Sequence, residues 1–223
     1  MTFALKNQSV DAIVAVLRAE AGELDFDPQG ARLFVAVLRA LSQGKPLSSE
    51  AVAALANGLG IPAEKAQELD WVAEKNEQEA IVGLAGLSLN DWNHTFWVNG
   101  RRFTTWCALD TLYLTPLLGQ TTQVETRDPV TKEPIRLTID PEGVRSYTPG
   151  SATLSIIIPQ VRIKGLQSAE QIWSAFCSYS HFFTSEQTAR AWFAGKEIEP
   201  LFLTIEEGFE LGRKWFENIG RYA

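Results

Sequence analysis

The sequence predicts an α+β fold, with a helical N-terminal part followed by a part that mixes antiparallel strands with helices. Apolar residues recur at helical spacing through about the first 80 residues. From about residue 81, short strand-like runs follow one another without strict alternation with helices. The chain has 223 residues, of which 45% are hydrophobic, so it can build a core. We therefore expect a helical domain at 1–82 and an α+β domain at 83–223.

The N-terminal part is expected to hold four helices. Residues 10–21 and 31–41 carry apolar side chains on one helical face, and Asp27-Pro28 suits the start of the second. Ser48-Ser49-Glu50 can cap a short helix to Ala56, and Ile61-Pro62 opens a further one toward Trp71. Because a glycine-containing turn at 57–60 joins these last two, the pattern is that of a helix-turn-helix.

The second part begins with a hairpin and a helix. Residues 95–104 are two strand-like runs around Asn99-Gly100, the strongest short signal for a β-hairpin. Residues 106–118 are apolar at helical spacing and stop at Gly119. Further strands are expected at Val124, 135–139 and 152–158, and further helices after the capping-box sequences 184–187 and 204–207.

The charge balance argues against a nucleic-acid partner. The chain has 20 basic and 27 acidic residues, and residues 1–82 alone carry a net charge of −5. The second helix of the helix-turn-helix, at 62–73, has no arginine to read a guanine edge. We therefore expect this unit to have a structural or covering role.

The apolar runs and the N-terminal residues indicate a cytoplasmic protein without a membrane partner. No run approaches the roughly 20 apolar residues that a membrane span needs, and the sequence at 1–9 has no basic stretch leading into an apolar one. In the reducing cytoplasm, Cys107 and Cys177 are expected to be free thiols.

The small number of sulfur and imidazole groups limits the possible metal chemistry. Two cysteines and two histidines exclude a four-cysteine zinc site, and the cysteines are too far apart for a zinc finger. His181 is interpreted as a hydrogen-bonded structural residue and His94 as loop surface. Any cysteine chemistry must be done by Cys107 and Cys177.

The segment Trp106-Cys-Ala-Leu-Asp110 is the most informative part of the sequence. Thr104 or Thr105 can cap the coming helix, which would place Cys107 in its first turn, where free N–H groups favour thiolate. Asp110 lies three residues on and shares that helix face, so a thiol and a carboxyl can exchange a proton. Taken singly, each cysteine could also be a small buried hydrophobe and Asp110 a surface partner of the helix dipole. The sequence does not place Cys177 beside Cys107.

At these residues the chain resembles the alkylmercury lyases, also called organomercurial lyases. The resemblance covers nearly the whole chain and is most specific at Thr105-Trp-Cys-Ala-Leu-Asp-Thr-Leu112, Ser174-Ala-Phe-Cys177 and His181-Phe-Phe183. It implies a winged-helix-like N-terminal domain at 1–82 and a catalytic domain at 83–223. It also implies that Cys107, Cys177 and Asp110 form a catalytic trio.

The implied reaction is protonolysis of the carbon–mercury bond, which gives a hydrocarbon and mercuric ion and serves mercury detoxification. Thiolates are the preferred ligands of a soft metal. Asp110 would take a proton from a cysteine and later deliver it to the departing carbon. No cofactor is expected, since mercury is bound as substrate and product. Low-molecular-weight thiols, or a mercuric reductase as acceptor, would remove the mercury.

One alternative is a non-catalytic protein of the same fold that binds a soft metal, mercury or copper, through the two thiols. A pure binder does not need a proton donor three residues after Cys107, so Asp110 favours the enzyme. The sequence differs from the family pattern in two places. Members often have a further, non-catalytic cysteine near the loop at 127–129, and this chain has none there. Members also often have a His-x-His sequence after the second cysteine, and here Tyr179 stands in place of its first histidine.

Overall fold

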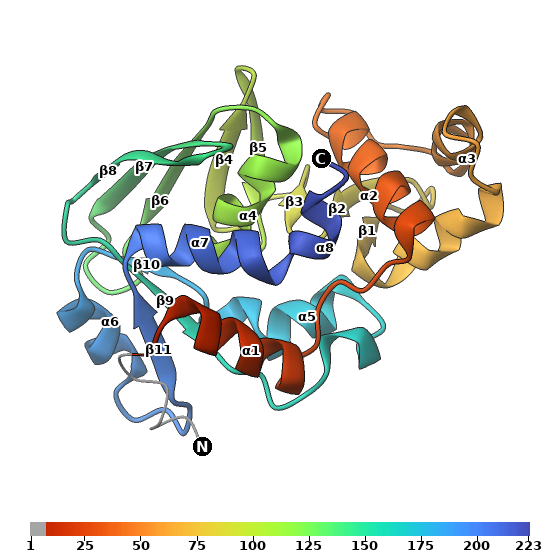
Figure 1. Ribbon diagram of the computed structural model, residues 1–223. Helices are drawn as coiled ribbons and strands as arrows, with labels where there is room; N and C mark the ends of the chain where they lie inside the picture. The colour runs from red at the N-terminus through yellow and green to blue at the C-terminus, as the bar shows by residue number, and fades with distance from the viewer. Residues whose placement is uncertain (1–7) are drawn as a thin grey trace.

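An eight-stranded antiparallel sheet is the main layer of the computed structural model, which describes residues 8–223 (Figure 1). Residues 1–7 lie outside the described part. The prediction that the chain carries no secretory leader rests partly on these residues and stays a prediction. The sheet has the order β1-β2-β3-β5-β4-β6-β7-β8. Its strands are β1 (Ala73–Lys75), β2 (Ile81–Leu84), β3 (Leu87–Ser88), β4 (His94–Val98), β5 (Arg101–Thr105), β6 (Thr122–Arg127), β7 (Pro134–Asp140) and β8 (Gly143–Thr148).

A smaller antiparallel sheet has the order β10-β9-β11. Its strands are β9 (Thr153–Ile157), β10 (Phe182–Phe183) and β11 (Pro200–Leu203). The α-helices are α1 (Val10–Glu20), α2 (Pro28–Leu41), α3 (Ser49–Gly58), α4 (Ala108–Leu118), α5 (Ala169–Ala175), α6 (Glu186–Phe193), α7 (Ile205–Trp215) and α8 (Glu217–Gly220). Within residues 8–223, the 3₁₀ segments are η2 (Ala63–Val72), η3 (Ile163–Gly165) and η4 (Cys177–Tyr179). This mixture of helices and antiparallel sheets confirms the predicted α+β class.

The predicted hairpin is β4 and β5. Asn99 and Gly100 have φ values of 50° and 71°, the left-handed conformation that a two-residue hairpin turn requires. Val98 pairs with Arg101, and side chains along β4 alternate between buried and half-buried positions. The hairpin ends where Cys107 begins α4, so it positions the start of that helix.

Helix α4 is buried on nearly every side, between the large sheet and α7 (Figure 1). It ends at Gly119, as predicted, with φ of 66°. Two glycines of α7 permit the close approach of the two helices. A Cβ on Gly208 would lie 2.9 Å from Leu112 Cδ1, and one on Gly212 would lie 2.9 Å from Tyr113 Cβ. The absence of side chains at these two positions therefore lets α7 pack directly against α4.

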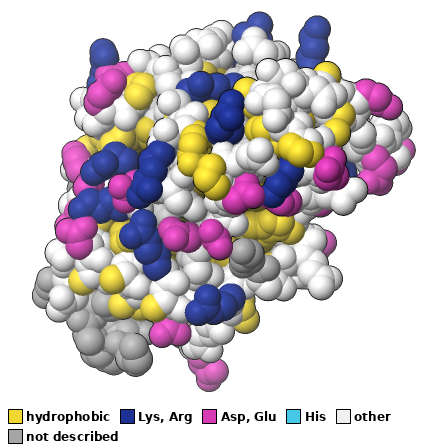
Figure 2. All heavy atoms as spheres, turned by 45° about the vertical axis from the view of Figure 1, so that its right-hand side comes forward, with side chains coloured by type: hydrophobic (Ala, Val, Ile, Leu, Met, Phe, Trp, Pro, Cys, Tyr) yellow, Lys and Arg dark blue, Asp and Glu magenta, His cyan; other side chains and the backbone are white. Residues whose placement is uncertain are grey.

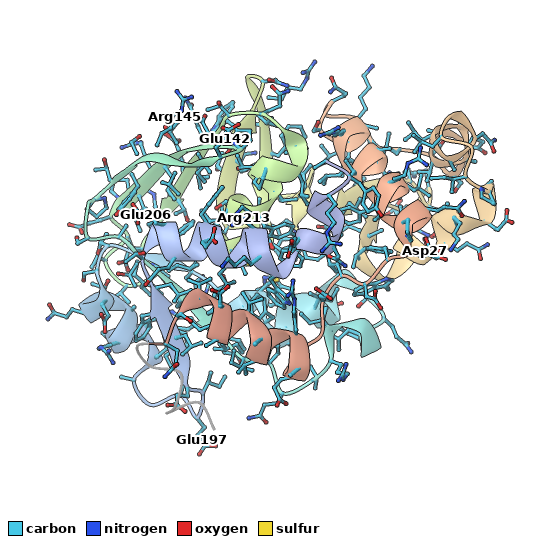
Figure 3. All side chains as sticks on the ribbon, viewed as in Figure 1. Asp27, Glu142, Arg145, Glu197, Glu206 and Arg213 are labelled. Carbon is cyan, nitrogen blue, oxygen red and sulfur yellow. The ribbon has the colours of Figure 1, made fainter. Side chains whose placement is uncertain are left out.

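Most predicted helix starts are confirmed. Ser48 caps α3, Thr204 caps α7, and Asp27, labelled in Figure 3, caps α2 by accepting a hydrogen bond of 2.8 Å from the Gly30 N–H. Two predictions need correction. The helix expected toward Trp71 is the 3₁₀ segment η2, and the cap of α6 is Ser185, one residue later than the predicted Thr184.

The N-terminal helices do not form a separate layer. Helix α1 lies beside α7 in Figure 1, and Arg18 Nη2 donates a hydrogen bond of 2.6 Å to the Lys214 carbonyl. The buried apolar side chains form one cluster that runs from Ile13 to Ile219. The predicted boundary between residues 82 and 83 falls within β2. The division at this boundary and the winged-helix character of residues 1–82 both stay predictions.

Charged side chains are distributed over the surface. On the face drawn in Figure 2, basic and acidic side chains lie intermixed, and Glu142, Arg145 and Glu197 project outward from the edge of the molecule in Figure 3. Within residues 8–223, no helix has both the length and the apolar character needed to cross a bilayer.

Candidate active site

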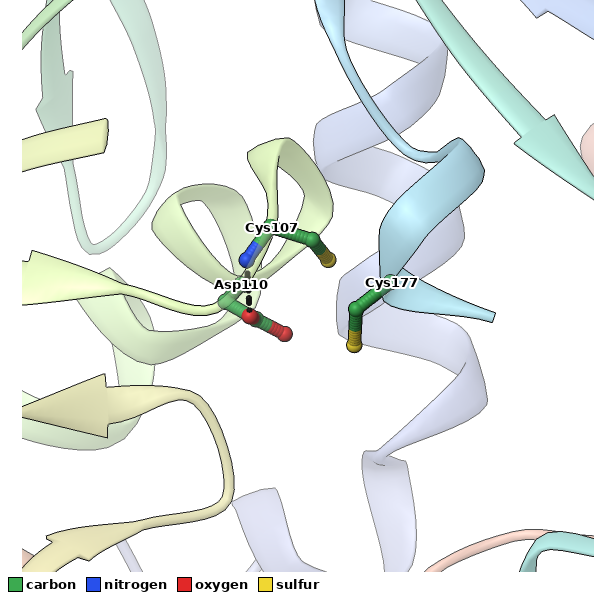
Figure 4. A group of neighbouring side chains, drawn as sticks. All are labelled: Cys107, Asp110 and Cys177. Atoms are coloured by element: carbon green, nitrogen blue, oxygen red, sulfur yellow. Dashed lines mark hydrogen bonds between the residues drawn. The ribbon is translucent and has the colours of Figure 1, made fainter. Parts of the chain in front are cut away.

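The structure brings together the three residues singled out in the sequence. The sulfur atoms of Cys107 and Cys177 and a carboxylate oxygen of Asp110 all lie within 4.8 Å of one another, and all three residues are buried. In Figure 4 the three side chains converge on one space between the start of α4 and the segment that carries Cys177. The two cysteines are free thiols, as predicted.

Cys107 is itself the N-cap of α4, which corrects the prediction that it lies in the first turn. Its backbone is extended, with φ of −149° and ψ of 174°. The Cys107 N–H donates a hydrogen bond of 2.7 Å to Asp110 Oδ2, and the Asp110 N–H points back to the Cys107 sulfur. Together they form a capping box in which a thiol takes the place usually held by serine or threonine. Thr105 instead donates to the Cys107 carbonyl at 2.9 Å.

Cys177 reaches Cys107 because the chain after α5 pairs with the start of α4. The Ala108 N–H donates to the Ser180 carbonyl at 3.1 Å, and the Leu109 N–H donates to Ser180 Oγ at 3.2 Å. Both N–H groups belong to the first turn of α4, where a helix has no internal acceptor for them. The contact that unites the two thiols is therefore also a helix cap.

Hydrogen bonds favour the thiolate form of Cys107. Burial raises the pKa of its thiol, but the Cys177 thiol, the Ser180 hydroxyl and the Asp110 N–H all donate to the sulfur. These bonds hold the pKa of Cys107 below its ordinary value. We expect the negative charge of the site to rest on this sulfur.

The other two groups are weaker acids than usual. The hydrogen bond that Cys177 donates to Cys107 raises its pKa well above the ordinary value, and burial adds to this. Burial also raises the pKa of Asp110 well above its ordinary value, and the charge on Cys107 raises it further. A carboxylate whose pKa is raised in this way can accept a proton from a thiol and then give it up to a stronger base.

A small apolar cavity of about 40 Å³ opens beside these groups. Asp110 and Cys177 line it, together with five aromatic side chains, Trp106, Tyr113, Phe176, Trp215 and Phe216. Such walls suit an organic group and exclude water, which strengthens electrostatic interactions inside the cavity. The two buried thiols lie close enough to bind one soft metal ion as thiolates. The Asp110 carboxyl group, with its raised pKa, lies beside them and can deliver a proton.

Comparison with known proteins identifies the family. The alkylmercury lyase family model matches residues 87–217. The chain is 38% identical over 185 residues to an alkylmercury lyase of Pseudomonas putida, which covers 82% of each protein. It is 35% identical over 184 residues to one of Staphylococcus epidermidis, with 81% of this chain and 80% of the relative covered. The chain belongs to the alkylmercury lyase family.

A solved structure supports the fold of this alkylmercury lyase family member. The mercury-bound form of MerB2 superposes with a TM-score of 0.70 at 20% identity, covering 95% of this chain and 98% of that one. The α+β arrangement therefore extends over nearly the whole protein.

Two residues that shape the site, Ser180 and Gly86, were not predicted from the sequence. Ser180 is fully buried and bonds to the start of α4, as described above. Gly86, between β2 and β3, has φ of 98°, and a Cβ there would lie 2.8 Å from Asp110 Oδ1. Glycine is thus required for Asp110 to occupy its place. A lone glycine in the sequence shows neither the conformation nor the neighbour that requires it.

The two histidines are buried or half-buried, and one was predicted correctly. His181 Nε2 lies 2.9 Å from the Ser178 carbonyl, which confirms the predicted hydrogen-bonded role. The interpretation of His94 as loop surface is wrong, because β4 begins at this residue and turns its ring inward, leaving it 3% exposed. Burial, with the neighbouring His181, lowers the pKa of His94 to about 3. Its ring is therefore neutral at physiological pH.

Proposed function

We propose that this protein cleaves the carbon–mercury bond of organomercurials by protonolysis, releasing a hydrocarbon and leaving mercuric ion. Cys107 and Cys177 would bind mercury, and Asp110 would carry the proton. The observation that supports this most directly is the meeting of two sulfurs and a carboxylate within 4.8 Å. The family relationship supports it independently, because the relatives of comparable length are alkylmercury lyases.

The reaction would use the different proton content of the three groups. Cys107, as thiolate, binds mercury and displaces its exchangeable ligand, which leaves as an anion. Cys177 gives its proton to the Asp110 carboxylate and binds mercury in turn. Asp110 then donates this proton to the carbon, and the electron pair of the carbon–mercury bond becomes the new carbon–hydrogen bond. Mercuric ion remains bound by two thiolates, and Asp110 is again a carboxylate.

The surroundings of Asp110 would assist both proton transfers. Because burial raises its pKa, its carboxylate is a stronger base than an ordinary aspartate and can accept a thiol proton. Positioned proton transfer of this kind contributes about 10²–10⁴-fold to a rate. The apolar walls would hold the organic group and keep competing water away from the transferred proton.

Mercury would leave by exchange with external thiols. We propose low-molecular-weight thiols, and a mercuric reductase as a protein acceptor, because only another thiolate competes well with two sulfur ligands. No cofactor enters the proposed steps. A cytoplasmic location, where thiols are kept reduced, would suit both the free cysteines and this release.

The direct test is anaerobic incubation with phenylmercury and excess thiol, with benzene and free mercury measured. We expect benzene from the native protein and none from Cys107→Ser or Cys177→Ser, because each variant lacks one of the two sulfur ligands. Tyr179→Phe should keep full activity, since its ring plays no part in the proposed steps. Full activity of Cys177→Ser would show that the two-thiolate mechanism is wrong.

The alternative function, storage of a soft metal such as mercury or copper, is supported by the same pair of buried thiols. Two thiolates hold metal whether or not turnover follows, so only the products separate the two functions. Stoichiometric retention of mercury by the native protein without any benzene would establish the binder.

A further inference from the structure

We propose that Glu74 is a positioning residue of the thiol site, which holds Cys107 and Cys177 at a fixed separation through a group of tryptophans. Glu74 lies on β1, half-buried, and accepts hydrogen bonds from four side chains. The donors are Ser88 Oγ at 3.0 Å, Asn90 Nδ2 at 2.7 Å, Trp92 Nε1 at 3.1 Å and Trp106 Nε1. This inference rests on the proposed function, in which Cys107 and Cys177 bind the same mercury atom, and it explains what keeps the two thiols in position to do so.

The first connection leads from Glu74 to Cys107. Trp106 directly precedes Cys107, is 3% exposed and lines the cavity. Its N–H is bonded to Glu74, so the indole that forms a wall of the cavity is held in one orientation. Hydrogen bonds to a charged acceptor are stronger than those between neutral groups. The start of α4 is thereby anchored to β1.

The second connection leads from Glu74 toward Cys177. The Trp92 ring lies 6.4 Å from that of Trp106 and 5.8 Å from that of Trp173, measured between ring centroids. Trp173 belongs to α5, the helix that ends two residues before Cys177. The three indoles therefore connect the element before one cysteine with the helix before the other, and Glu74 holds two of them.

The sheet is built to admit the Glu74 side chain. Glu74 pairs with Gly83 on β2, and a Cβ on Gly83 would lie 2.6 Å from Glu74 Oε1. Any larger residue at position 83 would displace the carboxylate from the indole N–H groups. Glycine is unfavourable inside a strand, and close approach of another group is a common reason for it there.

Fixed separation matters because both sulfurs must bind the same mercury atom. A second ligand in a rigid pair binds as if at high effective concentration, and this advantage is lost when the geometry varies. Loss of a residue that orients metal ligands typically costs about 10–100-fold in affinity or activity. We expect a loss in this range when Glu74 no longer orders the tryptophans.

The test compares Glu74→Met with the native protein. Methionine roughly keeps the length of the side chain but has no oxygen to accept from the two indole N–H groups, which both bond to Glu74 Oε1. We expect mercuric ion retained against competing glutathione to weaken by about 10–100-fold, with a parallel fall in benzene formation. The Trp92 and Trp106 indole N–H signals in NMR spectra should also shift, which reports the broken contact directly.

Asp128→Leu, which likewise removes both carboxylate oxygens at similar side-chain volume, is the matched control. Asp128 is also a carboxylate with four bonds, from the N–H groups of Val130, Thr131 and Thr184 and from Thr184 Oγ1, at 2.7 to 3.1 Å. It does not line the thiol cavity. This variant should lose stability but retain mercury as the native protein does.

Two results would overturn the inference. One is native mercury retention by Glu74→Met after its indole signals have shifted. The other is an equal loss of mercury in Asp128→Leu, which would show a general effect of stability. Failure of the proposed function is a separate result, because it would appear as absence of benzene from the native protein.

Discussion

Ser180 couples the two cysteine-bearing segments at the level of single atoms. Its hydroxyl accepts from the Leu109 N–H at 3.2 Å and donates to the Cys107 sulfur, which lowers the pKa of that thiol. A hydrogen bond to a charged group contributes about 1.5–3 kcal/mol. Because only the thiolate accepts strongly, removal of this donor disfavours the charged form.

We therefore predict that Ser180→Ala raises the pKa of Cys107. Below that pKa the thiolate fraction, and with it kcat/KM for organomercurials, should fall about tenfold. Since the lost thiolate reappears as pH rises, activity should recover at higher pH. Thiolate ultraviolet absorbance and the pH profile of kcat/KM measure this. Ser178→Ala, which removes only an exposed bond to the Ser174 carbonyl, is the control, and a Ser180→Ala profile equal to it would contradict the prediction.

Local spacing predicted part of the site. Cys107 and Asp110 lie one helical turn apart, so their contact follows from helix geometry alone. Cys177 is 70 residues from Cys107, and its place depends on Ser180 and on packing of α5 that no short pattern records. In the sequence, only the family resemblance indicated that the two thiols belong to one site.

At the scale of elements, the turn between β2 and β3 determines where Asp110 can lie. We predict that Gly86→Ala loses most activity, because its Cβ would collide with the Asp110 carboxyl. It should also lose about 1–2 kcal/mol of stability from the left-handed backbone. Activity per folded molecule, with the melting temperature, measures both effects.

Gly60→Ala is the matched control. Gly60 also has a left-handed backbone, with φ of 68°, but nothing lies within 4 Å of a Cβ there. It should lose stability and keep its activity per folded molecule. If Gly86→Ala behaves in the same way, Asp110 does not depend on this turn.

Elements with strong local signals were predictable, and those formed by distant pairing were not. Asn99-Gly100 and Thr204 carry their turn and cap chemistry within a few residues. The two-residue strands β3 and β10 exist only because partners elsewhere in the chain pair with them, so their sequences show no period. Cys107 is an intermediate case: the sequence predicted the helix that follows it but not its role as N-cap, because thiols seldom cap helices.

At the scale of the molecule, one core joins the elements of residues 8–223. Buried apolar side chains from α1 to α8 form one cluster, and β1 and β2 belong to the same sheet as β4 to β8. We predict that the segments 1–82 and 83–223 unfold together in a single transition, because neither can lose its structure without exposing the core of the other. Tryptophan fluorescence and far-ultraviolet circular dichroism should give coincident urea curves. Separated transitions would show that the two segments are independently stable.

The capping box at the start of α4 also offers a way to silence the chemistry without disturbing the architecture. Serine is among the residues that cap helices best, so Cys107→Ser should begin α4 at the same residue and keep the bond to Asp110. The variant would lose its thiolate alone. A protein of this kind could hold an uncleaved organomercurial on Cys177 long enough for crystallographic trapping, with every wall of the cavity still in place.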